Sequence, residues 1–149
     1  MATKYLSGGS KLEAALNQIA SQLDKGSVLR VGFLEGATYP DGTSVPMVAA
    51  INEFGAPSRG QPPRPFFRNM IAEHSEEWPD AIAANLKATG YDGAKTLALV
   101  GEGISAQLRQ SIVDLVSPPL APSTIRRKGF DKPLIDTSVM LNSIGVEVE

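Results

Sequence analysis

Apolar residues recur at helical spacing in several parts of the chain, and the first such part lies near the amino terminus. Ser10 and Glu13 have the spacing of a capping box, and Gly26 supplies the left-handed conformation that ends many helices. The apolar positions between them fall on one helical face: Leu12, Ala15, Leu16, Ile19, Ala20 and Leu23. The pattern predicts an amphipathic helix over residues 10–26.

The next part of the chain predicts a strand, a turn and a helix. Apolar and polar or small residues alternate over residues 28–34, as in a half-buried strand. Tyr39–Gly42 has the proline and glycine of a turn. Ser44 then caps a helix that has Pro46 in its first turn and ends at Gly55.

Two long apolar stripes follow a proline-rich loop. Pro79 lies inside the first stripe, so we expect a kink or break near residues 75–78. The second stripe starts near Asp92; Gly101 and Gly103 weaken this helix and indicate either close packing or a bend. The stripe residues are Phe67, Ile71, His74, Trp78, Ile82 and Leu86, and then Leu97, Val100, Ile104, Leu108, Ile112 and Leu115.

The carboxyl-terminal part predicts short elements. Residues 123–129 have the composition of one helical turn that closes at Gly129. Asp136 or Thr137 caps a short helix with apolar residues at Met140, Leu141 and Ile144, which Gly145 breaks. Alternation over residues 146–149 predicts a last strand. Few strands beside several helices predict an α+β fold with a small, mostly antiparallel sheet packed against the helices.

Composition bounds the class of protein. A chain of 149 residues with 42% apolar and 20% charged residues predicts a single domain, 1–149, with proline-rich loop arms at about residues 55–66 and 117–135. A net charge of −2 argues against a dedicated nucleic-acid binder. No apolar run is long enough for a membrane span, and the amino terminus lacks a secretory layout, so we expect synthesis in a cytoplasm.

Candidate catalytic chemistry is sparse. The chain has no cysteine, which removes disulfides and thiolate chemistry, and no glycine pattern that cradles phosphate. His74 is the one histidine, and none of Glu73, Glu76 and Glu77 is placed four residues away to orient it. We therefore predict a structural histidine rather than the centre of a hydrolase, and no catalytic residue, cofactor site or metal site.

Charged residues gather in three runs. Basic Arg59, Arg64 and Arg68 precede an acidic run, and a second basic cluster follows later in the chain. The acidic run is Glu73, Glu76, Glu77 and Asp80, and the later cluster is Arg126, Arg127, Lys128 and Lys132 with Phe130 as its aromatic neighbour. Such runs are commonly solvated faces, but they also suit complementary contact between copies of a chain or non-specific contact with a DNA backbone.

Phe66 and Phe67 are adjacent aromatic residues at the end of the proline-rich loop. Phe67 belongs to the helical stripe, which predicts a core position. Phe66 then points toward another element or a partner, although a loop folded back on the domain would also bury it. We predict that Arg64 and Phe66 lie at a subunit contact and that Phe66→Ala weakens assembly while leaving the monomer folded.

Two ordered motifs resemble a known family. The first, Ile51-Asn52-Glu53-Phe54-Gly55 followed by Pro62-Pro63-Arg64-Pro65-Phe66-Phe67-Arg68, is similar to the NEFG and PPRPFLR pattern of tailed-bacteriophage tail-completion and virion-morphogenesis proteins. The second, residues 133–144, looks like the PLxDTGxLxxSI signature of the same group, with Ser138 where glycine is commoner. Together they cover under half of the chain.

The resemblance implies a virion structural protein of the neck or tail end, located in the virion and assembled in the host cytoplasm. It implies a ring of about six copies, with neck, connector or tail-tube proteins as neighbours. Its interface residues would be Arg59, Arg64, Phe66, Arg68, Arg126, Arg127, Lys128 and Phe130, on loop arms that order on assembly. The alternative is a packaging or head-completion accessory protein that contacts DNA through residues 126–132.

Overall fold

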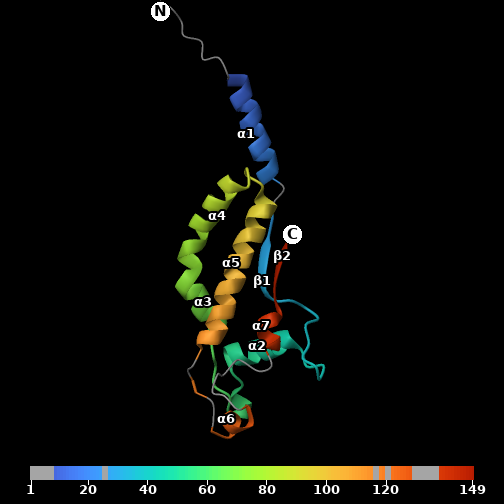
Figure 1. Ribbon diagram of the computed structural model, residues 1–149, viewed down its shortest axis with the longest axis vertical. Helices are drawn as coiled ribbons and strands as arrows, with labels where there is room; N and C mark the ends of the chain where they lie inside the picture. Colours follow the sequence, from blue (N-terminus) through green and yellow to red (C-terminus); the bar gives the residue numbers. More distant parts are fainter. Residues whose placement is uncertain (1–8, 25–26, 116–117, 120–121, 129–137) are drawn as a thin grey trace, which may run out of the picture.

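The computed structural model describes residues 9–24, 27–115, 118–119, 122–128 and 138–149 (Figure 1). In chain order the elements are α1 (Gly9–Leu23), β1 (Leu29–Phe33), α2 (Val45–Phe54), the 3₁₀ turn η1 (Pro57–Arg59), α3 (Phe66–His74), the 3₁₀ turn η2 (Ser75–Glu77), α4 (Trp78–Ala88), α5 (Gly93–Asp114), α6 (Pro122–Lys128), α7 (Val139–Asn142) and β2 (Ile144–Val148). The described strands form one two-stranded antiparallel sheet, and the predicted α+β class is confirmed.

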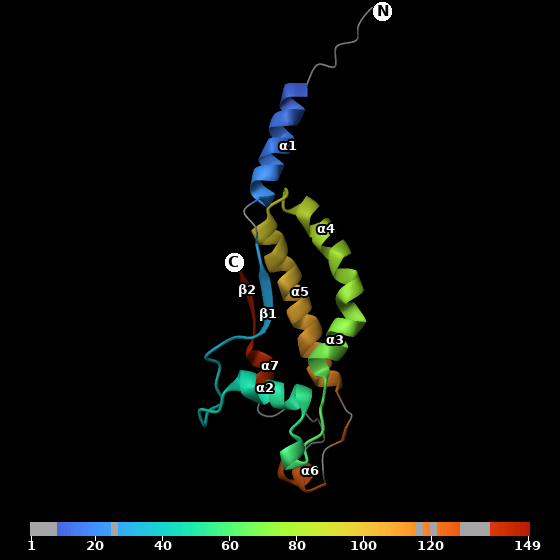
Figure 2. The same ribbon diagram turned by 180° about the vertical axis from the view of Figure 1, so that it is seen from behind.

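Helix α5 is the centre of the structure. It contacts both strands on one side and α3 and α4 on the other, an arrangement that is visible from front and back (Figures 1 and 2). Asp92 caps it as the sequence predicts: its Oδ1 accepts the Lys95 backbone N–H at 3.0 Å. Among the described residues, no helix combines the length and the apolar content that a membrane span requires.

Helix α5 lies unusually close to the sheet at Gly101. A Cβ added there would lie 2.5 Å from Val146 Cγ1 and 2.7 Å from Leu29 Cδ1. The glycine therefore serves close packing of a helix on a sheet, one of the two outcomes that its position predicted. A Cβ at Gly103 would meet nothing within 4 Å.

The predicted break after α3 is confirmed. Helix α3 ends at His74, η2 follows, and α4 begins at Trp78 with Pro79 in its first turn. Proline is tolerated there because the first N–H groups of a helix have no intrahelical partner. The predicted turn at Tyr39–Gly42 and the Ser44-capped helix α2 are also present.

The carboxyl-terminal helix ends earlier than predicted. Ile144 is the first residue of β2 and pairs with Phe33, so Gly145 lies within the strand instead of breaking a helix. The Arg109 guanidinium explains the boundary, because it donates to the carbonyls of Leu141 at 3.4 Å and Ile144 at 3.2 Å. Asp136, Thr137 and Gly129, which were predicted to cap or close short helices, lie outside the described residues.

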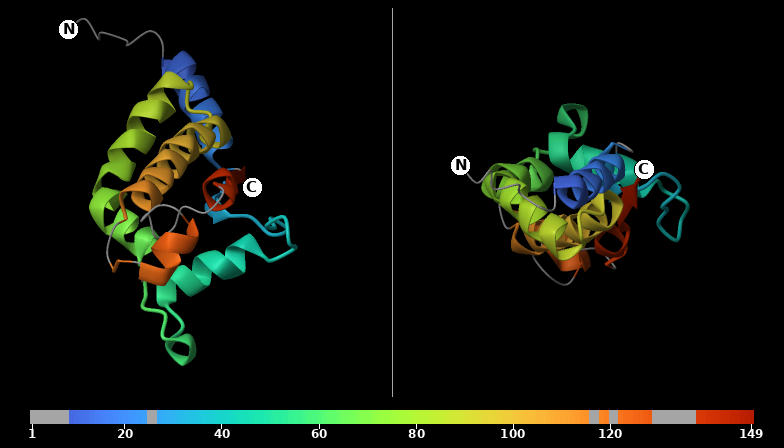
Figure 3. Two further views of the ribbon diagram at one scale, coloured as in Figure 1. Left: turned by 60° about the horizontal axis from the view of Figure 1, so that its bottom comes forward. Right: turned by 90° about the horizontal axis from the view of Figure 1, so that it is seen from above.

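Helix α1 forms where the sequence predicts it but differs in two respects. It begins at Gly9, so Ser10 lies inside the helix and the predicted capping box is wrong; Gly26 is outside the described residues. None of its residues is buried. Figure 1 shows it extending beyond α4 and α5, and the right-hand view of Figure 3 looks down on this end of the molecule.

The core buries Phe66, one of the two outcomes left open by the sequence, and places Phe67 at its edge instead of inside it. Phe66 is 1% exposed and belongs to the main core cluster, whereas Phe67 is half-buried at its edge. The reason is the helical register of α3: Phe66 and Met70 are one turn apart and face α5, and Phe67 and Ile71 form the adjacent, more exposed row. The buried core residues are Val45, Ala49, Phe66, Met70, Leu108, Ile112, Met140 and Ile144.

Candidate interaction site

The first motif of the sequence forms a tight connection between α2 and α3. Helix α2 ends at Gly55, whose N–H donates to the Ile51 carbonyl and whose φ is 77°. A Cβ at Gly55 would lie 2.8 Å from the Pro63 nitrogen and 2.9 Å from the Gln61 carbonyl oxygen. Glycine is required here for both its backbone conformation and the close approach of the returning chain.

The proline-rich loop is a hydrogen-bonded hairpin in the single chain. Ala56 and Gln61 exchange two backbone hydrogen bonds of 2.9 and 3.1 Å around η1. Asn52 ties the hairpin to α2: its Oδ1 accepts from Gln61 Nε2 at 3.2 Å, and its carbonyl accepts the Arg64 N–H at 2.6 Å. Residues 55–66 therefore form a hydrogen-bonded hairpin within the single chain, and the expectation that this arm orders on assembly stays a prediction.

Glu53 joins the end of α2 to the start of α3. Its carboxylate is almost fully buried and accepts the backbone N–H groups of Phe67 at 2.9 Å and Arg68 at 3.2 Å. A carboxylate in this position satisfies two otherwise unpaired N–H groups and complements the positive end of the helix dipole. We call the contacts of Asn52, Glu53 and Gly55 with the hairpin and α3 the α2–α3 clasp.

Arg68 extends the clasp to the surface. Its Nε donates to Glu53 Oε1 at 2.7 Å, its Nη2 donates to the Glu53 carbonyl at 3.0 Å, and its guanidinium carbon lies 5.3 Å from the centroid of the Phe54 ring. Phe54 itself is 66% exposed. The clasp thus holds one large aromatic ring in solvent beneath a cation.

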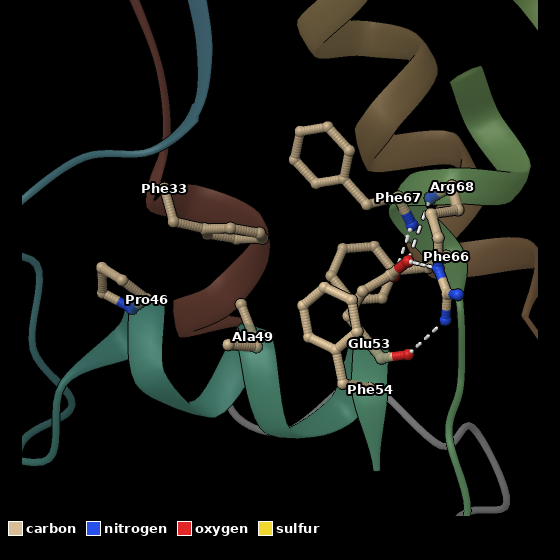
Figure 4. A pocket seen from close by; sticks show the side chains of 9 residues that line it. Phe33, Pro46, Ala49, Glu53, Phe54, Phe66, Phe67 and Arg68 are labelled. Atoms are coloured by element: carbon tan, nitrogen blue, oxygen red, sulfur yellow. Dashed lines mark hydrogen bonds and ion pairs between the residues drawn. The ribbon is translucent and has the colours of Figure 1, made fainter.

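An apolar hollow of about 350 Å³ opens beside this ring (Figure 4). Its walls come from β1, α2 and α3, and the rings of Phe33 and Phe66 meet edge to face at its base, with centroids 6.0 Å apart. The lining residues are Phe33, Pro46, Ala49, Ala50, Glu53, Phe54, Phe66, Phe67 and Arg68. An open apolar hollow with a charged rim suits contact with an apolar side chain of another molecule.

Arg64 is placed differently from the prediction. It is 7% exposed, and its Nε donates to the Pro118 carbonyl at 3.3 Å. Burial lowers the pKa of its guanidinium because the charged form loses hydration. Arg64 therefore joins the two predicted arms within one chain, and neither Arg64 nor Phe66 presents its side chain to a partner.

The remaining predicted interface residues are only partly described. Arg59 is exposed on the hairpin, and Arg126 and Arg127 are exposed on α6, at the same end of the molecule (Figures 1 and 2). The side chain of Lys128 and all of Phe130 and Lys132 lie outside the described residues. The structure thus brings Arg59, Arg126 and Arg127 to one end, opposite α1.

His74 lies between α3 and η2. Its Nδ1 is buried without a hydrogen bond and is 3.6 Å from Glu77 Oε2. The polar hollow beside it is lined by Asn69, Glu73, His74, Gln107, Gln110, Ser111, Asp114 and Leu115. Ser111 is the one hydroxyl residue among those that line this hollow, and its hydroxyl donates to the Phe66 carbonyl at 2.6 Å. In the described part of the chain, no three acidic or histidine side chains gather as a metal site would require.

Comparison of the chain finds no match to a family model, to a curated protein or to a solved structure.

The sequence reasoning missed Phe54 and the Glu53 cap. Glu53 caps the start of α3, but the N–H groups that it accepts lie 14 and 15 residues further along the chain. A capping motif read from neighbouring residues cannot detect such a distant contact.

Proposed function

We propose that this chain is a non-catalytic structural subunit of a tailed-phage virion that forms a ring with copies of itself at the head–tail junction or the tail end. The observation that carries the proposal is Phe54, an exposed ring held beside an apolar hollow by the α2–α3 clasp. Large apolar side chains fixed in an exposed position are typical anchors of protein–protein contacts.

The polar residues of the first motif support a structural role. The Asn52 side chain bonds to Gln61 of the hairpin and to the Val48 carbonyl of α2. The Glu53 carboxylate accepts the first N–H groups of α3, and Gly55 allows the chain to return closely. These residues fix the shape of a surface, so the part of the sequence that resembles virion-morphogenesis proteins builds an interface and leaves no polar group of the clasp for catalysis.

A ring needs two different surfaces on each copy, because head-to-tail contacts between identical subunits are heterologous. The structure offers distinct ends, with α1 at one and the hairpin and α6 at the other (Figure 1). Neighbouring neck, connector or tail-tube proteins would meet these ends in the assembled virion.

Native mass measured over a concentration series tests the proposal. A discrete species of about six copies is expected for the wild-type chain. Phe54→Ser should lower its abundance, and Leu99→Ser, a control at an equally apolar and exposed site on α5, should not. A wild-type chain that stays monomeric at every concentration contradicts self-assembly into a ring.

The DNA-contacting alternative rests on the exposed Arg126 and Arg127. If it holds, the wild-type chain binds duplex DNA at low salt, binding weakens steeply with added salt, and Arg126→Ala with Arg127→Ala abolishes it. Absence of binding at low salt removes this alternative, whatever the native mass.

A further inference from the structure

Helix α1 presents an apolar seam that the rest of the described chain covers only in part, near Leu23. Leu12, Leu16 and Leu23 are 62%, 56% and 46% exposed. With Ile19 they are spaced by four, three and four residues, which is the repeat of a helix that packs along a partner. A helix of this length has little stability in water unless its apolar face is buried.

The composition of α1 also fits an interface. Its 15 residues include two charged side chains, Lys11 and Glu13, and its other face carries Asn17, Gln18, Ser21 and Gln22. Solvated helices usually carry more charge, whereas the centre of an interface is depleted of it.

The same chain contains an open groove of matching character. Helix α5 forms its floor, and β1 on one side and α3 with α4 on the other form its walls. It has a volume of about 350 Å³ and is lined by Leu29, Val31, Phe67, Met70, Ile71, Trp78, Ile82, Leu97, Val100 and Ile104. Ile71 is 40% exposed at its edge, and no residue of α1 lines it.

We infer that α1 of one copy packs into the α3–α5–β1 groove of a second copy. The seam from Leu12 to Leu23 is roughly 16 Å long at the rise of a helix. The groove residues of α5 run from Leu97 to Ile104, roughly 10 Å along the helix, and those of α3 and α4 extend from Phe67 to Ile82. Seam and groove are two different surfaces of one chain, so the contact is heterologous and can be repeated around a ring.

Charges set the direction of α1 in the groove. Its amino-terminal end carries Lys11 and the positive end of the helix dipole, and Asp24 follows its carboxyl end. Helix α4, which lines the groove with Trp78 and Ile82, carries Asp80 in its first turn and Lys87 in its last turn. Complementarity therefore places α1 parallel to α4.

Disulfide trapping tests the contact cleanly, because the natural chain has no cysteine. Leu16→Cys chains are mixed with chains that carry Ile71→Cys or Ile82→Cys, and the mixture is oxidised. Gln18→Cys, on the opposite face of α1, replaces Leu16→Cys in the control. Docking should form the mixed dimer roughly a thousandfold faster than the control, since it raises the effective thiol concentration from micromolar to millimolar.

Three other outcomes would each contradict the docking of α1 in the groove of a second copy. Dimers of Leu16→Cys with itself, at the expense of the mixed dimer, show that two α1 helices pair with each other. An intrachain disulfide in a chain carrying both cysteines, without a mixed dimer, shows that α1 folds onto its own groove. Mixed dimers no faster than the Gln18→Cys control show that the groove does not hold α1.

The inference rests on the proposed self-assembly, and the experiments distinguish a failure of the α1 contact from a failure of ring formation. A ring in the native-mass experiment without trapping removes the α1 contact and leaves the ring. A second variant, Leu12→Glu, should abolish assembly, and in the Leu16→Cys chain it should also abolish trapping, while the melting temperature of the monomer stays unchanged because Leu12 is 62% exposed in the single chain.

Discussion

Helices α1 and α5 have similar apolar patterns in the sequence and opposite surroundings in the structure. Helix α5 buries Val100, Leu108 and Ile112 between the sheet and α3–α4, and Asp92 caps its start. Helix α1 buries nothing. An amphipathic pattern therefore predicts that a helix forms and which face needs cover, but not whether the cover belongs to the same chain.

The difference extends to the groove that α5 helps to build. The face of α5 toward the sheet is closed by Leu29 and Val146, which crowd against Gly101, while its face toward Ile71 and Ile82 remains open. Within the described residues there is thus both a helix whose apolar face is largely uncovered and a groove without an occupant.

The largest expected effect comes from Phe66, which packs on α5. Phe66→Ala should lower the free energy of unfolding by about 4 kcal/mol, because it leaves a cavity in the core. Chemical denaturation measures the change. Phe54→Ala should alter stability by less than about 0.5 kcal/mol, since that ring is exposed. Equal losses from the two variants would contradict the assignment of Phe66 to the core.

A matched pair of leucines tests the two helices directly. Leu108→Ala in α5 should cost about 3 kcal/mol, because Leu108 is fully buried. Leu16→Ala in α1 should change the unfolding free energy of the monomer by less than about 0.5 kcal/mol. Denaturation at a concentration where the chain is monomeric gives both values. A large loss from Leu16→Ala there would mean that α1 packs on its own chain.

A pair of glycines tests how closely α5 approaches the sheet. Gly101→Ala should destabilise the protein by about 1 kcal/mol, since overlap with Val146 and Leu29 outweighs the gain in helix propensity. Gly103→Ala meets open space and should stabilise it by up to about 1 kcal/mol. Melting temperatures of both variants check the signs, and a stabilising Gly101→Ala would refute the close contact.

The smallest effect concerns the capped start of α5. The Lys95 backbone hydrogen bond lowers the pKa of Asp92 below its ordinary value of 3.8. A depressed folded-state pKa contributes stability above the ordinary value and loses it as the pH falls toward the folded value. Below about pH 4, the melting temperature of the wild type should therefore fall more steeply than that of Asp92→Asn. Parallel curves would contradict this contribution of the charge.

The sequence predicted the helices, the strands and the break before Pro79, because each depends on local periodicity, proline or glycine. It failed where two rows of the same helix were both apolar. Phe66 with Met70 and Phe67 with Ile71 have the same spacing, so the pattern of α3 contains no information about which row faces α5. It also missed the Glu53 cap, since the groups that Glu53 satisfies follow a long loop.

By itself, then, the sequence determined where most helices and strands lie and, outside α3, which of their faces must leave water. The tertiary structure decided the remainder: Arg64 and Phe66 are held inside the chain, Phe54 is held outside, and the groove beside α5 stays open. The physical reason is the distance along the chain over which each kind of interaction acts. Backbone propensity and periodicity depend on residues a few positions apart. Burial depends on which segment, often distant in the sequence, packs on each face.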